Sequence, residues 1–116
     1  MACGTDCQRK PTVKGPYLKR TTTVGSYGAN RFGLHDMHGN VWEWCSDLFD
    51  ENYYGNSPSE DPQGPFSGSP RVVRGGSWYT VTGYSRSAYR DWGTPDLRND
   101  VDLYGFRVVS ESVRTP

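Results

Sequence analysis

The chain has 116 residues, enough for one domain, and its thirteen basic and thirteen acidic side chains give a formal net charge of zero. A neutral chain has no overall field that attracts nucleic acid or an anionic membrane, so neither is expected as a partner. Only 34% of residues are hydrophobic, and no apolar run approaches the roughly 20 residues that a membrane-spanning helix requires. An aromatic share of 14% without net charge argues against disorder and for an aromatic, glycine-rich core.

The three cysteines are odd in number and follow no regular spacing, so they do not indicate a disulfide framework. Cys3 and Cys7 are too few to form a zinc site on their own. Cys45 follows a tryptophan near a predicted strand end, and we expect it to be a buried, unreactive thiol. The N-terminus lacks the apolar centre of a signal peptide, which makes the cytoplasm the default expectation.

In chain order, the first segment is basic. Residues 1–20 carry five basic groups against one acid and are punctuated by proline and glycine. No period of two or of 3.6 residues is present there, which predicts an extended N-terminal arm. Residues 21–24 are a short β-branched run that favours an edge strand ended by glycine. Residues 31–38 are compatible with one helical turn or with a tight loop.

The next segment carries the first predicted core residues. Residues 41–45 alternate, which predicts a strand with Trp42 and Trp44 on one face and Glu43 on the other. We expect the two tryptophans to fill the core. Residues 50–70 are rich in Pro, Gly, Ser, Asn and acids, which predicts a long loop. A loop of that length in a small domain is usually functional or held by a metal.

The C-terminal part contains two more predicted strands. Residues 71–74 favour a strand that stops at two glycines and resumes at 77–78. Residues 79–104 carry Tyr, Arg, Trp, Asp and Asn without clean periodicity, which predicts a second long loop. Residues 106–109 favour a final strand, and residues 111–116 form a polar tail. No stretch of ten residues has convincing helical periodicity.

Oxygen atoms recur around one glycine turn. Asp36 and Glu43 supply carboxylates there, and Gly39 and Val41 supply backbone carbonyls. In an extended chain alternate residues present their carbonyls in the same direction, so the four oxygens can converge. Hard oxygens suit Ca²⁺, whereas zinc and copper prefer His or Cys. The alternative is that Glu43 forms a salt bridge with an arginine such as Arg74.

Four segments within residues 24–109 closely resemble, in order, the C-terminal half of the formylglycine-generating enzyme (sulfatase-modifying factor) family: NRFGLHDMHGNVWEWCSD, PRVVRGGSW, SRSAYRDWGTPDLRND and YGFRVV. The resemblance implies an α+β, loop-rich fold with short antiparallel strands over residues 21–110, a truncated version of the family's C-type-lectin-like fold. It also implies a structural calcium ion at the matching positions, with side-chain or main-chain oxygens from Asp36, Gly39, Val41 and Glu43.

The resemblance does not extend to the family's copper ligands. The family oxidase uses copper bound by two cysteines, and the matching positions here are Thr80 and a position near Ser85. No cysteine follows Cys45, so the resemblance implies the scaffold without the copper chemistry. Ser77 and Trp42 match residues near the family's oxygen pocket, and without thiolates we expect both to be structural.

The matched part also corresponds to only the second half of a family member. Half a fold would leave sheet edges and apolar faces bare. The chain is then a minimal or truncated version of the fold, or it associates with itself to cover the gap. We predict a homo-oligomer.

The expected function is non-catalytic binding by a calcium-stabilised module, with a protein or small-molecule ligand on the 79–104 loop. Tyrosine and tryptophan dominate recognition surfaces, and the candidates are Tyr79, Tyr84, Tyr89 and Trp92. We expect structural roles for Trp42, Trp44, Arg86, Arg90 and Arg107. The three arginines are expected to be buried and paired with acids such as Asp91 or Asp96.

Two alternatives stay open. The chain could be part of a formylglycine-generating-type oxidoreductase, or of a related metalloenzyme, completed by a partner chain. Relatives with this fold that use iron take histidines largely from outside the matched segment, and His35 and His38 alone cannot form a three-histidine site. Histidines on a loop are more often surface groups than ligands. The last alternative is a decayed fragment without an independent role.

Overall fold

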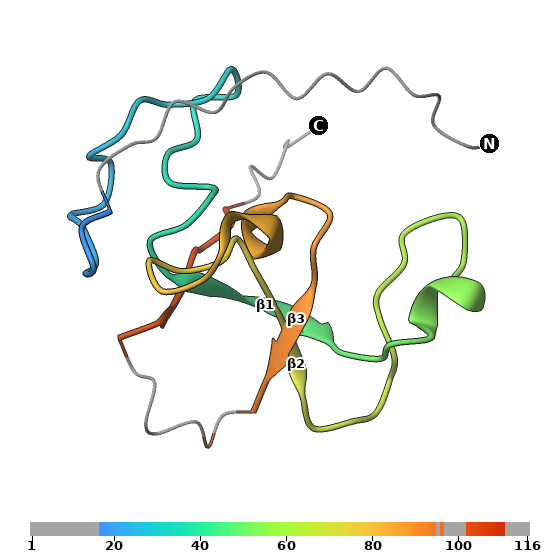
Figure 1. Ribbon diagram of the computed structural model, residues 1–116. Coiled ribbons are helices and arrows are strands. Elements are labelled where there is room, and N and C mark those ends of the chain that lie inside the picture. Colours follow the sequence, from blue (N-terminus) through green and yellow to red (C-terminus); the bar gives the residue numbers. More distant parts are fainter. Residues whose placement is uncertain (1–16, 95, 97–101, 111–116) are drawn as a thin grey trace, which may run out of the picture.

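The structure, a computed structural model, describes residues 17–94, 96 and 102–110. These residues form one four-stranded sheet with the strand order β3-β2-β1-β4, together with two short 3-10 helices, η1 and η2 (Figure 1). The elements in chain order are β1 (Trp42–Leu48), η1 (Tyr53–Gly55), β2 (Arg71–Arg74), η2 (Thr82–Ser85), β3 (Asp91–Gly93) and β4 (Tyr104–Phe106). The sheet with few helices is consistent with the predicted α+β class.

The sheet is mixed rather than antiparallel. β2 pairs antiparallel with both β1 and β3, but β4 pairs parallel with β1. The expectation of antiparallel strands alone is therefore wrong at one edge. β4 lies at the opposite edge of the sheet from β3, beside β1 and in the same direction. Parallel neighbours cannot be joined by a tight hairpin, and β1 and β4 are far apart in the chain.

An irregularity in β1 limits how far this pairing continues. Trp44 is paired with Val73, but Leu48 is paired with Arg71, so the β1 side holds two more residues than the β2 side between these pairs. Extra residues of this kind bend a strand and increase its twist. Trp44 is also the last β1 residue paired with β4, where it lies beside Phe106. The bulge therefore marks the end of the β4 pairing.

The core is small and lies on β1 and β2. Among the described residues, the buried hydrophobic side chains are Trp42, Val72 and Val73. Trp42 packs against Tyr89 with ring centroids 6.2 Å apart. Trp44 is only half-buried and stacks on Tyr104. The prediction that both tryptophans fill the core is thus confirmed for Trp42 only.

Three predicted strand segments differ from the structure. Residues 77–78 do not resume the strand, because the chain turns after β2 ends at Arg74. Residues 21–24 form no strand, because the backbone amide of Thr22 donates to the Asn40 side chain rather than to a sheet neighbour. The last strand is Tyr104–Phe106 instead of residues 106–109. Pairing ends at Phe106 because β1 bulges at that level, so the residues that follow have no strand to join.

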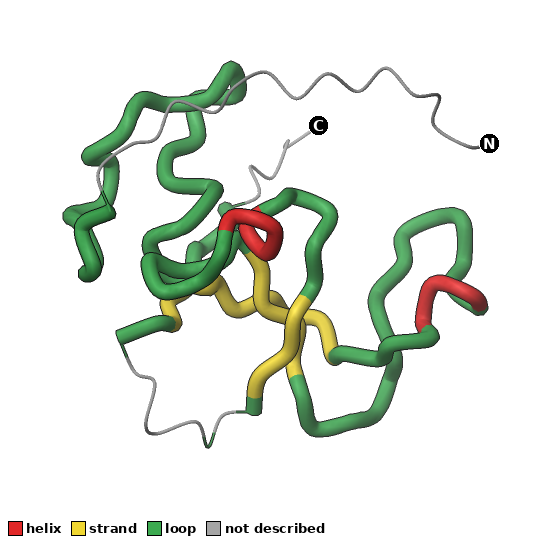
Figure 2. The backbone as a smooth tube through the Cα atoms, in the orientation of Figure 1, coloured by secondary structure: helices red, strands yellow, loops and turns green. Residues whose placement is uncertain are grey.

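Long loops make up most of the chain (Figure 2). Residues 17–40 lie on one side of the sheet, and the segment that carries η1 lies on the other (Figure 1). Residues 31–38 form a tight loop without a helix, and residues 50–70 are a loop apart from η1. The region 79–104 is not purely a loop, because it contains η2 and β3. In the part that the structure describes, no helix is long and apolar enough to cross a membrane.

Several predicted features lie outside the described residues. They are most of the basic arm at 1–20, the cysteines Cys3 and Cys7, the tail at 111–116 and part of the 79–104 region.

Candidate functional site

The Asp36 carboxylate has one satisfied and one unsatisfied oxygen. Its Oδ2 accepts a hydrogen bond from the backbone amide of Gly25 at 2.6 Å. Its Oδ1 is buried and has no hydrogen-bond partner. Asp36 also has a left-handed backbone, with φ of 55°. A buried oxygen of a carboxylate without a partner is costly, and it calls for a missing donor or cation.

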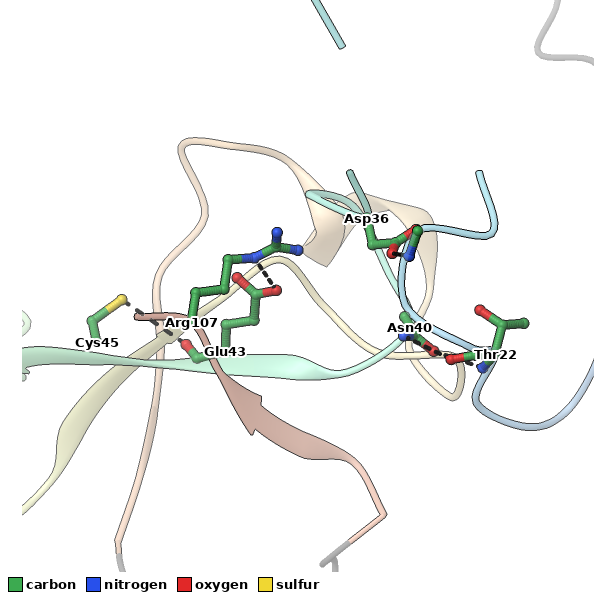
Figure 3. Close-up of polar contacts among 7 residues, drawn as sticks. Thr22, Asp36, Asn40, Glu43, Cys45 and Arg107 are labelled. Carbon is green, nitrogen blue, oxygen red and sulfur yellow. Dashed lines mark hydrogen bonds and ion pairs between the residues drawn. The ribbon is translucent and has the colours of Figure 1, made fainter. Parts of the chain in front are cut away.

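The turn after Asp36 ties three segments together. Gly39 has φ of 95°, a conformation that favours glycine, and its amide donates to the carbonyl of Gly75 at 2.7 Å. Asn40 follows with φ of 67°. Its side-chain oxygen accepts from the Thr22 amide at 2.9 Å (Figure 3). Its carbonyl accepts from the Trp78 amide at 2.8 Å. Sequence reasoning missed Asn40, although an Asn after Gly signals a left-handed turn.

Three of the four predicted metal ligands line one cavity. The cavity has a volume of about 600 Å³, and Asp36, Val41 and Glu43 contribute to its wall together with Asn40. Gly39 is not among the lining residues. The wall is otherwise largely apolar and includes Phe106 of the edge strand β4.

Arg107 occupies the same cavity and pairs with one of its carboxylates. Arg107 Nε lies 2.6 Å from Glu43 Oε1 (Figure 3). The arginine considered from the sequence, Arg74, is instead the β2 residue opposite Glu43 in the sheet. The Arg74 guanidinium donates to the carbonyls of Ser87 and Tyr89, at 2.9 Å and 3.3 Å. Glu43 therefore does form a salt bridge, but with a different arginine.

Calcium fits this donor set in part. The partnerless Asp36 Oδ1 and the carboxylate of Glu43 are hard oxygens in one cavity. Arg107 competes for Glu43, because a guanidinium and a metal ion cannot use the same oxygen at once. A calcium ion bound through Oε1 would therefore require the ion pair to open.

By the family resemblance, Thr80 matches one copper-binding cysteine and the second would lie near Ser85, and the fold brings the hydroxyls of these two residues together. Gly76 has φ of 73°, and a Cβ at this position would collide with the Ser85 hydroxyl and lie 3.0 Å from Thr80 Oγ1. Both hydroxyl oxygens therefore lie close to the same position beside Gly76. Copper(I) needs soft thiolates, and hydroxyl oxygens do not supply them. Within the described segments, no group of three or more His, Cys, Asp or Glu side chains could hold a metal ion.

The Thr80 hydroxyl also closes the turn that follows β2. It accepts a hydrogen bond from the Ser77 amide at 2.8 Å and lies 3.0 Å from the Ser77 carbonyl, to which it donates. The Ser77 side chain is buried and accepts from the Tyr79 amide at 3.3 Å. Through these contacts Ser77 and Thr80 stabilise the turn, which agrees with the structural role expected for Ser77.

The four predicted ligand-binding aromatics do not lie at one place. Tyr89 and Trp92 line an open groove of about 410 Å³ with Arg86 and Arg90. Tyr84 packs edge-on against Tyr89, with ring centroids 4.9 Å apart. Tyr79 instead packs against Trp78 in the loop after β2. Trp92 remains 53% exposed, which leaves its ring available for contact.

The three arginines that were expected to be buried partners of acids differ from that expectation. Arg86 and Arg107 are exposed, and Arg90 is half-buried. Arg86 donates to the carbonyl of Gly83 at 2.9 Å, and Arg90 donates to the carbonyl of Asp50 at 3.3 Å. Arg86 and Arg90 thus donate to loop carbonyls instead of to the expected acids. Arg107 does pair with a carboxylate.

Two groups near the sheet have raised pKa values. Burial raises the pKa of the Cys45 thiol above its ordinary 9.0, and nearby Arg74 offsets this only in part. Burial, aided by Asp91, raises the pKa of the Tyr89 phenol above 10.0. Both groups therefore stay protonated at neutral pH, although Cys45 is half-buried rather than buried as expected.

The two histidines are exposed, as expected from the sequence. His35 Nδ1 lies 2.7 Å from the Tyr27 carbonyl, and His38 Nδ1 lies 2.6 Å from the Ser85 carbonyl. Each ring therefore fastens one loop to another.

Comparisons with known proteins agree with the sequence motifs. Residues 8–112 match the family model of the sulfatase-modifying factor enzyme 1-like domain. The formylglycine-generating enzyme of Streptomyces coelicolor is 44% identical over 95 residues, which are 79% of this chain and 30% of that protein. The serine/threonine-protein kinase pkn1 of Chlamydia pneumoniae is 46% identical over 89 residues, which are 75% of this chain and 14% of that protein.

A solved structure supports the same relationship. Treponema denticola variable protein 1 has a TM-score of 0.66 and 39% sequence identity, with 75% of this chain and 31% of that chain covered. The chain belongs to the sulfatase-modifying factor enzyme 1-like domain family, in which related members are formylglycine-generating enzymes. It spans about a third or less of the length of the relatives that it matches.

Proposed function

We propose that this chain is a non-catalytic, calcium-stabilised binding module, built on the C-type-lectin-like scaffold that the family resemblance implies. The observation that carries the proposal is the hydroxyl pair of Thr80 and Ser85 around Gly76. The family resemblance implies thiolates of the oxidase at Thr80 and near Ser85, and oxygen ligands do not support copper(I) chemistry. A chain that keeps the scaffold and lacks the thiolates has a binding role as its simplest use.

Calcium would be held by Asp36 and Glu43 through side-chain oxygens and by Gly39 and Val41 through carbonyls. The partnerless, buried Oδ1 of Asp36 supports this assignment. Calcium takes six to eight oxygen ligands at about 2.3–2.6 Å, so water molecules would complete the coordination around these four protein oxygens. Because Asp36 lies in the loop before β1 and Glu43 lies on β1, the ion would act as a cross-link between them.

The ligand surface would be the groove beside Trp92. Tyr89 and Trp92 supply aromatic area, and Arg86 and Arg90 supply donors. Arg90 is already placed over the rings of Phe49 and Tyr54, at 5.3 Å and 4.2 Å from their centroids. Fixed arginines and exposed aromatic rings are typical of the residues that dominate recognition surfaces. Tyr84, which packs against Tyr89, would contribute from the edge of this surface, whereas Tyr79 lies apart from it beside Trp78.

Calcium-dependent thermal unfolding tests the proposal. At calcium one hundred times its dissociation constant, the expected gain in stability is about 2.7 kcal/mol. Glu43→Gln keeps the side-chain volume and should abolish the gain, whereas magnesium, which demands tight octahedral geometry, should give a smaller one. No calcium-dependent shift, or stoichiometric copper or iron in the purified protein, would overturn the assignment.

A catalytic role completed by a partner chain is the second candidate. It is favoured by the relatives named formylglycine-generating enzyme, of which this chain covers only about a third.

Association would also cover apolar side chains at the β4 edge, where Phe106, Val108 and Val109 are 75%, 85% and 89% exposed. A homo-oligomer is the form that we propose. Sedimentation at micromolar concentration tests it, and a monomer would count against it.

A further inference from the structure

A small cavity lies between the first described segment and the loop that follows β2. Its volume is about 180 Å³, and its wall is drawn from three parts of the chain, with Arg20, Thr22, Asn40 and Trp78 among the lining residues. It shares only Asn40 with the cavity proposed to hold calcium, and it shares no residue with the groove beside Trp92. The cavity is therefore a separate site.

Two lining residues carry buried polar atoms without hydrogen-bond partners, Thr22 Oγ1 and Trp78 Nε1. In the described part of the chain only three side-chain atoms are in this condition, and two of the three belong to residues that line this one cavity. An indole nitrogen can only donate, and a hydroxyl can donate as well as accept. Because native proteins leave few such atoms unpaired, the pair points to a missing acceptor.

Asn40 holds both of these residues in place. Its side-chain oxygen accepts from the Thr22 amide at 2.9 Å, and its side-chain nitrogen donates to the Thr22 carbonyl at 3.4 Å (Figure 3). Its own carbonyl accepts from the Trp78 amide at 2.8 Å. One residue thus fixes the backbone on both sides of the cavity, so the two unpaired atoms come from positioned segments.

The charges around the cavity are positive. Lys19 and Arg20 belong to its wall, and the lining residues include no Asp or Glu. Lys19 also has a left-handed backbone, with φ of 54°. Such strain in a residue other than glycine is concentrated at ligand sites. Positive charge, donors without acceptors and a strained lysine all favour a negatively charged ligand.

We propose that this cavity binds a small oxyanion, a carboxylate or phosphate group, which accepts hydrogen bonds from Trp78 Nε1 and Thr22 Oγ1 beside Arg20. The volume equals that of about six water molecules at roughly 30 Å³ each, which is enough for such a group. Because neither buried atom is open to water, surrounding side chains shift when the anion enters.

The indole N–H signals in a nitrogen–proton NMR spectrum test the proposal on the full chain. The four tryptophans give four such signals, and the Trp78 signal is the one lost in Trp78→Phe. Sodium phosphate and sodium acetate are titrated separately, with chloride used to hold the ionic strength constant. The Trp78 signal should move in a saturable way with a dissociation constant of about 1 mM or below, while the other three should move less.

Two variants connect the signal to the cavity. Arg20→Gln should weaken binding about tenfold, because the charge-assisted contact is lost. Arg31→Gln is the matched control, since Arg31 lies over Phe32 and does not line the cavity, and it should leave affinity unchanged. Thr22→Val should weaken binding without loss of stability, because it removes a buried hydroxyl that is unpaired in the free protein.

The outcomes separate the sources of the oxyanion. A response to phosphate alone supports a phosphate-bearing ligand, and a response to acetate alone supports a carboxylate. A shift that chloride reproduces, a Trp78 signal that never saturates, or equal affinities in the Arg20 and Arg31 variants would overturn the proposal.

Discussion

Arg107 and Glu43 form an ion pair across β1 and the chain that follows β4, with Nε and Oε1 2.6 Å apart. The two residues are 64 positions apart in sequence. The parallel pairing of Glu43 with Gly105 brings Arg107 to the Glu43 side of the sheet. The same carboxylate is a proposed calcium ligand, so the guanidinium and the ion compete for it.

Replacing Arg107 by glutamine should therefore raise calcium affinity. An exposed ion pair is worth at most about 1 kcal/mol, which corresponds to roughly fivefold in a binding constant. The stability of the calcium-free chain should change by no more than about the same 1 kcal/mol. Isothermal titration with calcium measures the first quantity, and urea unfolding in a chelator measures the second.

Arg31→Gln serves as the matched control, because Arg31 contacts Phe32 and lies outside this cavity. Unchanged or weaker calcium binding in the Arg107 variant alone would show that the ion pair and the metal do not compete.

Gly76→Ala should strongly destabilise the chain. An alanine at this position would have to keep the left-handed backbone of Gly76, which costs about 1–2 kcal/mol. Its Cβ would also collide with Ser85, and such overpacking costs about 1–3 kcal/mol more. Gly83→Ala is a control in the same region, because a Cβ there meets nothing within 4 Å. Urea unfolding of the two variants should differ clearly, and equal midpoints would contradict the packing around Gly76.

Trp42→Ala should cost about 3–5 kcal/mol, because Trp42 is the largest of the buried hydrophobic side chains among the described residues. Trp92→Ala should change stability by only about 0.5 kcal/mol, since Trp92 is 53% exposed. Thermal unfolding followed by circular dichroism compares the two. Similar losses in both variants would show that Trp92 is covered in solution, as association through that groove would require.

Cys45 should be slow to react with an aromatic disulfide reagent until the pH exceeds 9.0, because burial raises the pKa of its thiol. The unfolded thiol loses its proton at lower pH than the folded one. The stability that this protonated thiol contributes is fully present below the unfolded pKa and is lost as the pH rises through the folded pKa.

The reaction is measured in a chain with Cys3 and Cys7 replaced by serine, so that only one thiol is present. Comparison with Cys45→Ser in urea unfolding should show the wild-type advantage shrinking above pH 9.0. Fast labelling of the folded chain at neutral pH would contradict a raised pKa.

The strands on either side of the core could be predicted locally. Alternation around Trp42 and the β-branched run at Val72 and Val73 both indicate strands, and both become the paired core strands β1 and β2. β3 could not be predicted, because three residues with Trp92 at the centre carry no period. Their strand state comes from pairing with β2.

The candidate sites show the same division. The oxygens of Asp36 and Glu43 could be recognised from their spacing, and both line one cavity in the fold. The pairing of Glu43 with Arg107 could not be recognised from spacing, because only the parallel pairing of β4 with β1 brings Arg107 close to Glu43. The role of Asn40 could not be predicted either, because Asn40 is hydrogen-bonded to Thr22 and Trp78, which are far from it in sequence.

The sequence by itself determined the family, the loop-rich character, the core position of Trp42 and the absence of thiolates at Thr80 and Ser85, because these depend on residue identity and local spacing. Only the tertiary structure decided the parallel edge strand, the partner of Glu43 and the cavity that Asn40 closes. The physical reason is that each of these depends on contacts between segments distant in sequence, where chain crossover and burial, rather than local propensity, select the neighbours.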